Sequence, residues 1–272
     1  MTQTAPNYVL GSSDQEIARL DGQAASIEAA TRLLLGGAGI GPGMRVLDLG
    51  TGLGHVARLV AELVGPVGQV VGLDTSARLL EVARARTQDH PQVTFVQGDV
   101  REWQGARPFD AVVGRLILFH LPDAGAALRH QLTALRPGGL MLMLDFDLGS
   151  SRAEPPVPLV TQALEWVQAA FRSAGANPTI GTRLAPLLEG AGLRDVQTFG
   201  VQGYLTPDDG RGPALLGGVV RAVAPQIMAA GIATPEQLGI ETLAGRIAAA
   251  VQATGSTVLP PALAGAWGRR GQ

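Results

Sequence analysis

The sequence predicts an α/β protein with a doubly wound, mostly parallel sheet. Short apolar, β-branched runs alternate with segments whose apolar residues recur at helical spacing, as in successive strand-helix units. Acidic residues also end three of the expected strands, at Asp48, Asp74 and Asp99. Because ligands of open α/β sheets bind at the carboxyl ends of the strands, these three side chains are expected to line one site.

The expected elements follow in order along the chain. Strands are expected over 44–49, 68–73, 92–97, 109–114 and 139–146, and helices over 54–64, 76–88 and 123–135. Apolar residues at helical spacing, such as Val56, Leu59, Val60 and Leu63, predict the first of these helices. Ser13 to Glu16 has the form of a capping box, and two helices are expected after it. Asp110, which enters the fourth strand, is expected to bond backbone and to lie outside the site.

Helical segments interrupt the alternation after the fifth strand. A proline- and serine-rich stretch precedes a helical pattern over 159–173, and a second excursion over 213–253 separates a sixth strand (196–204) from a seventh (257–267). Both excursions and the N-terminal helices are expected to form a helical cap over the cofactor edge. The predicted segments are N-terminal helices 1–39, core 40–148, cap insertion 149–180, return to the core 181–204, second cap insertion 205–255, and seventh strand with C-terminus 256–272.

Composition excludes several classes of function. The 272 residues have a formal net charge of -2 and no long basic run, which argues against a nucleic-acid partner. Cysteine and lysine are both absent, so disulfides, thiolate nucleophiles and lysine Schiff bases are excluded. No signal peptide or apolar run of about 18 residues is evident, so a cytoplasmic protein without a membrane partner is expected, as a monomer or homodimer.

The glycine loop Asp48-Leu49-Gly50-Thr51-Gly52-Leu53-Gly54 follows the first strand directly. Only glycine permits both the tight strand-to-helix turn and the close approach of a bulky ligand to backbone. Two alternatives remain open, a simple turn and a nicotinamide-dinucleotide site. His55 stands where the dinucleotide fingerprint requires glycine or alanine, and Asp48 and Asp99 also fit that fingerprint poorly.

Five ordered motifs over about residues 40 to 148 give the chain a family resemblance. They are the glycine loop, Gly72-Leu73-Asp74-Thr75-Ser76 with Leu79-Leu80, Gly98-Asp99-Val100, Phe109-Asp110-Ala111-Val112-Val113, and Leu135-Arg136-Pro137-Gly138-Gly139. Together they resemble class I S-adenosylmethionine-dependent methyltransferases, in the small-molecule branch that is similar to ubiquinone/menaquinone C-methyltransferases. The resemblance implies a seven-stranded Rossmann-like sheet, with an antiparallel seventh strand, and a helical cap.

The resemblance also implies a cofactor site for S-adenosyl-L-methionine, with S-adenosylhomocysteine as the product. Asp48 would orient the amino group, Asp74 would accept hydrogen bonds from the ribose hydroxyls, and Asp99 would receive the adenine amino group. The other implied contacts are Gly50, Thr51, Gly52 and Gly54 against methionine and ribose, Thr75 and Leu79 in the second motif, Val100 at the ring, and Arg115 and Leu116 near methionine.

Catalytic and substrate residues are less well defined by the sequence. His120, after the fourth strand, is the candidate general base, and its alternative is a turn into a helix capped by Asp123. Tyr8, Asp145 and Trp166 are candidate substrate contacts. Asp147 lies two residues beyond Asp145, but no third ligand at metal-binding spacing follows, so no metal is expected. Trp166 could equally belong to the core of the cap.

The predicted function is methyl transfer to a small, apolar or aromatic metabolite, at a carbon, oxygen or nitrogen atom. The Asn/Asp-Pro-Pro motif of enzymes that methylate nucleic-acid bases is absent from the segment 114–118. Three alternatives stay open. They are a cofactor-binding enzyme with another reaction, such as cyclisation or decarboxylation, a catalytically silent subunit, and an NAD-dependent oxidoreductase.

Overall fold

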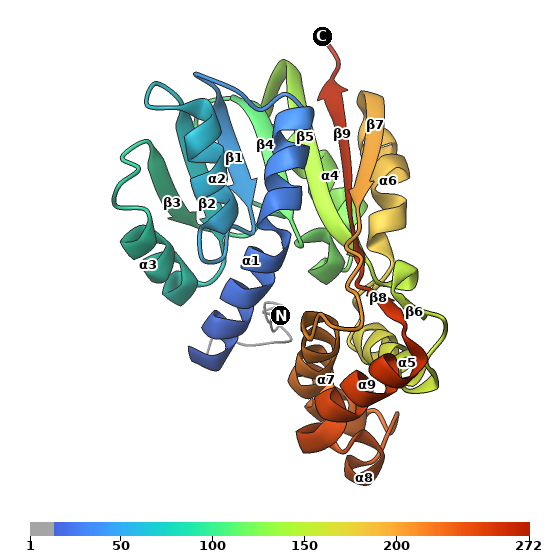
Figure 1. Ribbon diagram of the computed structural model, residues 1–272. Coiled ribbons are helices and arrows are strands. Elements are labelled where there is room, and N and C mark those ends of the chain that lie inside the picture. Colours follow the sequence, from blue (N-terminus) through green and yellow to red (C-terminus); the bar gives the residue numbers. More distant parts are fainter. Residues whose placement is uncertain (1–13) are drawn as a thin grey trace. The chain divides into compact units, whose positions relative to one another are not determined.

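The computed structural model describes residues 14–272, which form two compact units (Figure 1). The sheet unit contains residues 14–145, 181–200 and 263–272. The helical unit contains residues 146–180 and 201–262. The candidate Tyr8 and the serine of the expected capping box, Ser13, lie outside the described residues.

Seven strands form the sheet of the sheet unit, in the order β3-β2-β1-β4-β5-β9-β7. Their bounds are β1 (Arg45–Leu49), β2 (Gln69–Asp74), β3 (Val93–Gln97), β4 (Phe109–Arg115), β5 (Leu135–Asp147), β7 (Leu193–Val201) and β9 (Ala262–Arg270). The pairs from β3 across to β5 are all parallel. Figure 1 shows β9 running opposite to β1 and β7. The predicted doubly wound, mostly parallel seven-stranded sheet is confirmed.

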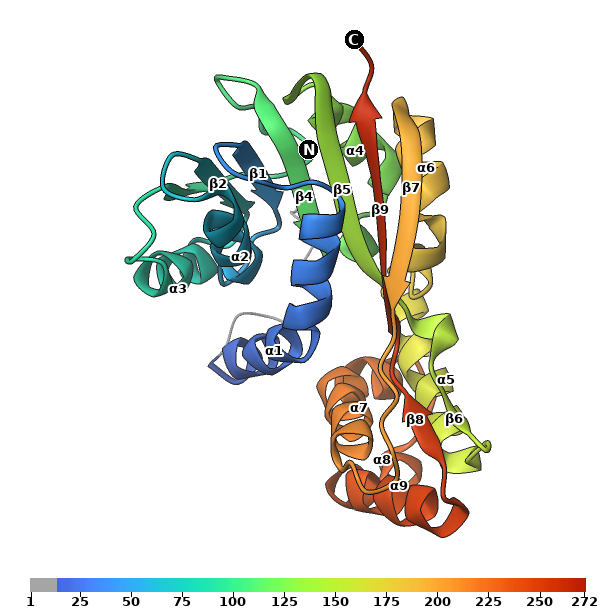
Figure 2. The ribbon, with the colours of Figure 1, turned by 45° about the horizontal axis from the view of Figure 1, so that its top comes forward.

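Helices cover both faces of this sheet. Figures 1 and 2 show α1 (Asp14–Gly37) and α2 (His55–Val64) in front of it, and α4 (Ala124–Leu132) and α6 (Leu184–Ala191) behind it. Helix α3 (Ala77–Arg86), in the same unit, follows β2. One face of α2 is fully apolar and buried, as the helical spacing of its valines and leucines predicts.

The core of the sheet unit lies around the inner strands β1 and β4. Leu47 is fully buried and sits in register with Val71 on β2 and with Val112 on β4. One residue further, Asp48 lies opposite Gly72, where a Cβ would stand 2.6 Å from the Phe95 ring. Gly72 therefore leaves room for the Phe95 side chain of β3 to pack beside the end of β1.

Asp110 ties the amino-terminal ends of two strands together. Its Oδ2 accepts a hydrogen bond from the backbone N–H of Arg45 at 2.8 Å, and its Oδ1 accepts one from Arg136 Nε at 2.6 Å. Because β1 and β4 are parallel, this bond lies at the edge of the sheet opposite to their carboxyl ends. The prediction that Asp110 bonds backbone is confirmed.

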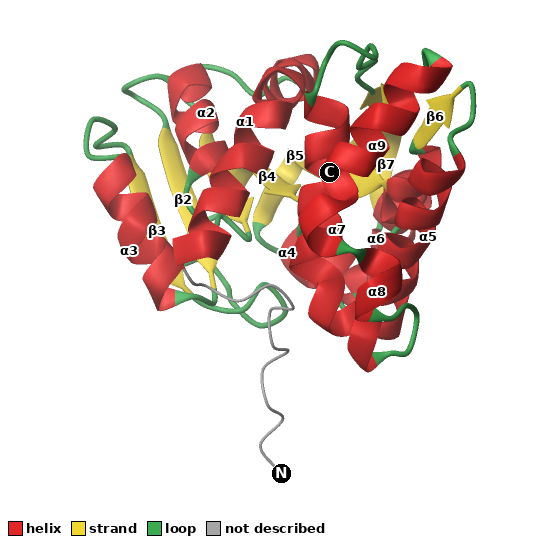
Figure 3. Cartoon of the chain, turned by 60° about the horizontal axis from the view of Figure 1, so that its bottom comes forward, coloured by secondary structure: helices red, strands yellow, loops and turns green. Residues whose placement is uncertain are grey.

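The helical unit is built from two separate segments of the chain. It contains α5 (Pro158–Ser173), α7 (Arg211–Ala229), α8 (Pro235–Leu238) and α9 (Ile240–Thr254), and the short antiparallel strands β6 (Arg152–Glu154) and β8 (Thr257–Leu259), as Figure 3 shows by colour. Helices α7 and α9 approach so closely that a Cβ on Gly217 would lie 2.8 Å from Ala244 Cβ. Apolar residues of α5, α7 and α9 form the core of this unit.

The observed elements differ from the predicted ones at three places. A single helix, α1, replaces the two expected N-terminal helices, and it belongs to the sheet unit. The expected seventh strand is split at Pro260 and Pro261 into β8 and β9, because proline lacks the N–H that a ladder needs. Strand β6 falls in a stretch that the sequence predicts as a proline- and serine-rich linker. None of the described helices is both long and apolar enough to cross a membrane.

Candidate functional site

The loop 50–54 joins β1 to α2 and consists largely of backbone in unusual conformations. Gly50, Gly52 and Gly54 have φ angles of 64°, 52° and 79°. This left-handed region disfavours residues that carry a Cβ. A Cβ on Gly50 would also lie 2.8 Å from Ile117 Cδ1. The loop therefore needs glycine at the predicted positions, and it presents bare backbone at the carboxyl end of β1.

Replacing Gly50 with alanine is expected to lower the free energy of unfolding by about 2 to 4 kcal/mol, through backbone strain and the contact with Ile117. Gly255 is a matched control, because it is left-handed with a φ of 63° and a Cβ there would meet no atom within 4 Å. Gly255→Ala should carry only the strain, about 1 to 2 kcal/mol. Thermal and denaturant unfolding of both variants measures the difference, and equal losses would show that the space around Gly50 does not matter.

Asp74, at the end of β2, holds the glycine loop in place. Its Oδ2 accepts the backbone N–H of Gly52 at 2.9 Å, and its Oδ1 accepts that of Ser76 at 2.9 Å. Burial raises the pKa of Asp74, against the effect of these backbone bonds. Each carboxylate oxygen has a second lone pair left after its backbone bond, so the group can accept two further hydrogen bonds from a ligand.

The residues after Asp74 form the start of α3. Ser76 is the N-cap, and its hydroxyl accepts the N–H of Leu79 at 3.3 Å. The carbonyl of Thr75 accepts a hydrogen bond from Gln97 Nε2 at 3.0 Å. Leu79 is only 5% exposed and packs in the core. Thr75 and Leu79 thus follow the carboxyl end of β2, and Leu79 packs one face of α3 against the core.

Asp48 is a buried carboxyl group directly before the loop. It is 1% exposed, and burial raises its pKa to about 7, although a hydrogen bond from the Thr51 hydroxyl and the charge of Arg115 act in the opposite direction. Among the described residues, Asp48 Oδ2 and the Thr51 hydroxyl have no partner beyond one another. Buried polar atoms are nearly always bonded, so these two form a natural place for a polar ligand group.

Arg115 brings a buried positive charge to the end of β4. Its Nη1 donates a hydrogen bond to the hydroxyl of Thr31 on α1 at 3.0 Å. Burial lowers its pKa, and the charge of Asp48 works against that shift. The next residue, Leu116, has a φ of 58°, a strained value for a residue with a large side chain. The backbone contacts predicted for Arg115 and Leu116 stay a prediction, and the charge of the Arg115 side chain also lowers the pKa of Asp48.

Asp99 lies on the loop after β3 and is bound by its neighbour. Arg101 donates from its backbone N–H to Oδ1 at 2.8 Å and from its guanidinium to both carboxylate oxygens. These hydrogen bonds hold the pKa of Asp99 below its usual value. Asp209 and Arg211 in the helical unit repeat the same geometry, so the pair is a local motif of the backbone turn. Val100 is 6% exposed, so its side chain belongs to the core.

His120 lies on the segment that follows β4, and Asp145 of β5 bonds the residue before it. The backbone N–H of Phe119 donates to Asp145 Oδ2 at 3.1 Å, and the Phe119 ring stands edge-on to His120 at 5.0 Å. Burial, aided by the charge of Arg19, lowers the pKa of His120 to about 4. His120 is thus neutral near pH 7. The Asp145 carboxyl is fully buried, so its visible role is to anchor the turn that carries His120.

The remaining candidates lie in the helical unit or outside the described residues. Trp166 is 8% exposed within α5, as expected for a core side chain. Asp147 caps a short helical turn, and its Oδ1 accepts the N–H of Gly149 at 2.9 Å. The substrate contacts expected of Tyr8, Asp145 and Trp166 stay predictions. No group of three or more metal-ligating side chains occurs in residues 14–272.

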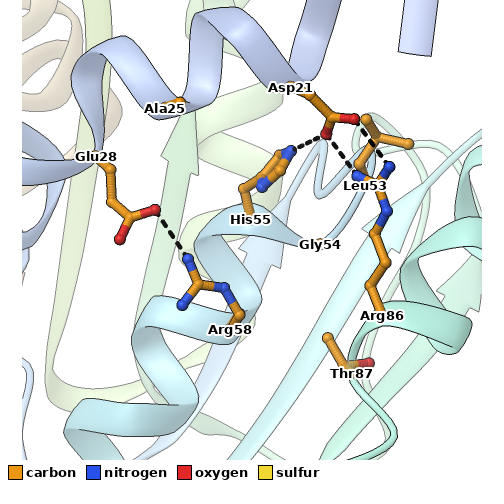
Figure 4. A pocket seen from close by; sticks show the side chains of 9 residues that line it. All are labelled: Asp21, Ala25, Glu28, Leu53, Gly54, His55, Arg58, Arg86 and Thr87. Carbon is orange, nitrogen blue, oxygen red and sulfur yellow. Dashed lines mark hydrogen bonds and ion pairs between the residues drawn. The ribbon is translucent and has the colours of Figure 1, made fainter. Parts of the chain in front are cut away.

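Polar residues of three helices meet at a pocket of ≈ 250 Å³ beside the glycine loop (Figure 4). Asp21 on α1 accepts hydrogen bonds from His55 Nε2 at 2.9 Å and from Arg86 on α3. Glu28 on α1 similarly accepts a bond from Arg58 on α2 at 2.9 Å. The sequence predicts mere packing for His55 and does not reveal its partners, because they lie on helices far along the chain.

The sheet order, the bare glycine loop and the acid at the end of β2 define a Rossmann-like fold, and folds of this class bind ligands at the carboxyl ends of their strands. A methyltransferase-domain model matches residues 40–189, more than half of the chain. The chain therefore belongs to the methyltransferase-domain family. The resemblance predicted from the five motifs is confirmed at the level of the family.

Curated relatives match about half of the chain. A trans-aconitate 2-methyltransferase of Azoarcus sp. (strain BH72) is 38% identical over 112 residues, which are 41% of this chain and 43% of the relative. A ubiquinone/menaquinone biosynthesis C-methyltransferase of Hahella chejuensis is 32% identical over 158 residues, or 57% of this chain and 59% of that one. The chain thus spans about half the length of the curated relatives it matches.

Solved structures share the fold. A phosphoethanolamine N-methyltransferase 2 of Haemonchus contortus, in complex with S-adenosyl-L-methionine, superposes with a TM-score of 0.55 at 20% identity, covering 90% of this chain and 53% of that one. A methyltransferase of Aquifex aeolicus gives a TM-score of 0.52 at 18% identity, covering 72% and 93%. At these identities the likeness establishes the architecture.

Proposed function

We propose that this protein transfers a methyl group from S-adenosyl-L-methionine to a small molecule. The observation that carries the proposal is the pinned loop, in which Asp74 fixes the backbone of Gly52 and keeps free acceptor positions on both carboxylate oxygens. Membership of the methyltransferase-domain family and the names of the curated relatives support the same reaction. S-adenosylhomocysteine would be the product.

The residues present fit this cofactor. Asp48 Oδ2 and the Thr51 hydroxyl, which have no partner beyond one another, can receive the ligand's amino group, and the glycine loop offers bare backbone to its methionine and ribose parts. Asp74 would accept the two ribose hydroxyls and Asp99 the adenine amino group. Arg115, close enough to influence the pKa of Asp48, would balance charge at the methionine end. When bound, the cofactor supplies a methyl group that is already activated by a sulfonium.

Because the leaving group is activated, the chain contributes mainly by orienting the reactants and excluding water. His120 is the residue we propose to receive a proton from the acceptor. Its lowered pKa leaves it unprotonated near pH 7, but also makes it a weak base. It therefore suits an acceptor whose own proton is acidic, or one that needs only a hydrogen bond.

We further propose that the acceptor is a small metabolite with an apolar or aromatic body. Relatives named for trans-aconitate and quinone methylation support a small-molecule acceptor. The formal net charge of -2 argues against a nucleic-acid substrate. Trp166 of α5 remains a candidate for contact with the acceptor.

Incubation with methyl-labelled S-adenosylmethionine and a panel of carboxylic acids, phenols and quinols tests the proposal. Label is expected in one acceptor class, with S-adenosylhomocysteine formed in equal amount. A turnover product without label would show a different cofactor-dependent reaction. Failure to bind S-adenosylhomocysteine in calorimetry would contradict the cofactor itself, and binding without turnover across the panel would favour a silent subunit.

A further inference from the structure

Arg101 holds the carboxylate of Asp99 in two ways, with its guanidinium and with its backbone N–H. The N–H of Arg101, which donates to Asp99 Oδ1 at 2.8 Å, belongs to the peptide whose carbonyl oxygen is that of Val100. Peptide groups are planar, so a constraint on that carbonyl is also a constraint on the N–H at the other end. Whatever holds the Val100 carbonyl therefore helps to set the direction of Asp99.

Gln131 on α4 holds this carbonyl. Its Nε2 donates to the oxygen of Val100 at 2.7 Å and to that of Trp103 at 3.1 Å. His130 Nε2 lies 3.1 Å from the same Trp103 oxygen. Trp103 in turn packs so tightly on Gly98 that a Cβ there would stand 2.9 Å from the indole. These contacts fix the loop 98–103 at both ends. Gln131 bonds two of its carbonyls, those of Val100 and Trp103.

We propose that Gln131 is a positioning residue for recognition of the adenine amino group. It would act through the Val100–Arg101 peptide and so aim the Asp99 carboxylate. The inference rests on the proposed function, because it takes Asp99 as the acceptor of that amino group. Gln131 itself touches no ligand; its effect is to narrow the range of directions that the carboxylate samples.

The burial of Gln131 supports a role beyond stability. The side chain is 1% exposed, and its Oε1 is buried without a hydrogen-bond partner among the described residues. A buried acceptor without a donor is destabilising. An apolar side chain of similar size would avoid that loss, so what distinguishes glutamine here is the pair of bonds that Nε2 makes to the loop.

The test compares two ligands that differ only at position 6 of the purine. Binding of S-adenosylhomocysteine and of its purine-riboside analogue, which has hydrogen in place of the amino group and keeps N1 as an acceptor, is measured by calorimetry. The protein is expected to prefer the amino form by about tenfold or more, and D99A should lose that preference. In Q131M the preference is expected to fall by about fivefold, because the carboxylate is no longer aimed.

Gln92 provides the matched control, since its Nε2 also donates to a carbonyl of the sheet unit, that of Ala61, at 3.3 Å. Q92M should keep the full preference for the amino form. If Q131M fails to fold, Q131N replaces it, because its shorter amide cannot reach the loop. A Q131M or Q131N protein with unchanged preference overturns the inference. If the unsubstituted protein binds neither ligand, the proposed function is overturned, and with it the inference.

Discussion

Asp74→Ala is expected to weaken binding of S-adenosylhomocysteine by about 2 to 4 kcal/mol, the largest loss of any single substitution at this site. The carboxylate would make two bonds to the ribose hydroxyls. It also accepts the backbone N–H groups of Gly52 and Ser76, so its removal frees the glycine loop as well. Titration calorimetry at pH 7.5, about the value where Asp48 is mostly ionised, measures the change.

Two variants separate the contributions to this loss. Asp74→Asn retains one acceptor oxygen and should lie between alanine and the original residue. Asp110→Ala removes a similar strand carboxylate that accepts a backbone N–H, but at the opposite edge of the sheet. It should lower the melting temperature and leave affinity unchanged. Unchanged affinity in Asp74→Ala would remove this residue from the site.

Ligand affinity is expected to rise with pH between about 5.5 and about 7.5, by up to about tenfold per unit below the pKa of Asp48. That pKa is about 7 in the free protein because the group is buried. The ligand's amino group is a cation in this range and favours the ionised carboxylate. Binding below pH 7 should therefore release a proton, which calorimetry in buffers of different ionisation enthalpy detects.

Folding stability depends on pH with the opposite sign to ligand affinity. The folded protein keeps a proton on Asp48 that the unfolded chain, with a pKa near 3.8, has already lost. The contribution of Asp48 to stability thus falls as pH rises from about 4 to about 7. Asp48→Asn should abolish proton release on binding. Asp99→Asn is the control, because the lowered pKa of Asp99 keeps that group ionised throughout, so its loss should weaken binding and preserve the pH slope.

Most of the sheet unit could be predicted from the sequence because its signals are local. Alternating apolar runs and glycines fix the strands up to β4 within a residue or two. The continuous α1 could not be predicted, because Gly22 within it resembles a helix break. Packing of buried α1 residues such as Leu34 and Leu35 offsets the low helix propensity of Gly22. Strand β6 exists only because it pairs with β8, about a hundred residues later in the chain.

Residues of the site could likewise be predicted only where their signals are local in the sequence. The glycine loop and Asp74 are recognisable because spacing along one strand-helix unit places them. Asp21 and Gln131 could not be found in this way, because their partners come from other helices and loops. The isolated signal at Gln131 is a polar residue among the apolar positions of a helix, and such residues are more often solvent-exposed. Only the fold shows that its amide turns inward.

The place of β9 in the sheet has a consequence for how the chain is made. Strand β9 is the last strand in the sequence, yet it lies inside the sheet, between β5 and β7. During synthesis the hydrogen-bonding edges of both neighbours stay open until residues 262–270 emerge. Open strand edges are templates for pairing with other chains. A nascent or truncated chain that lacks these residues therefore has two such edges, and the completed one closes both in a single step.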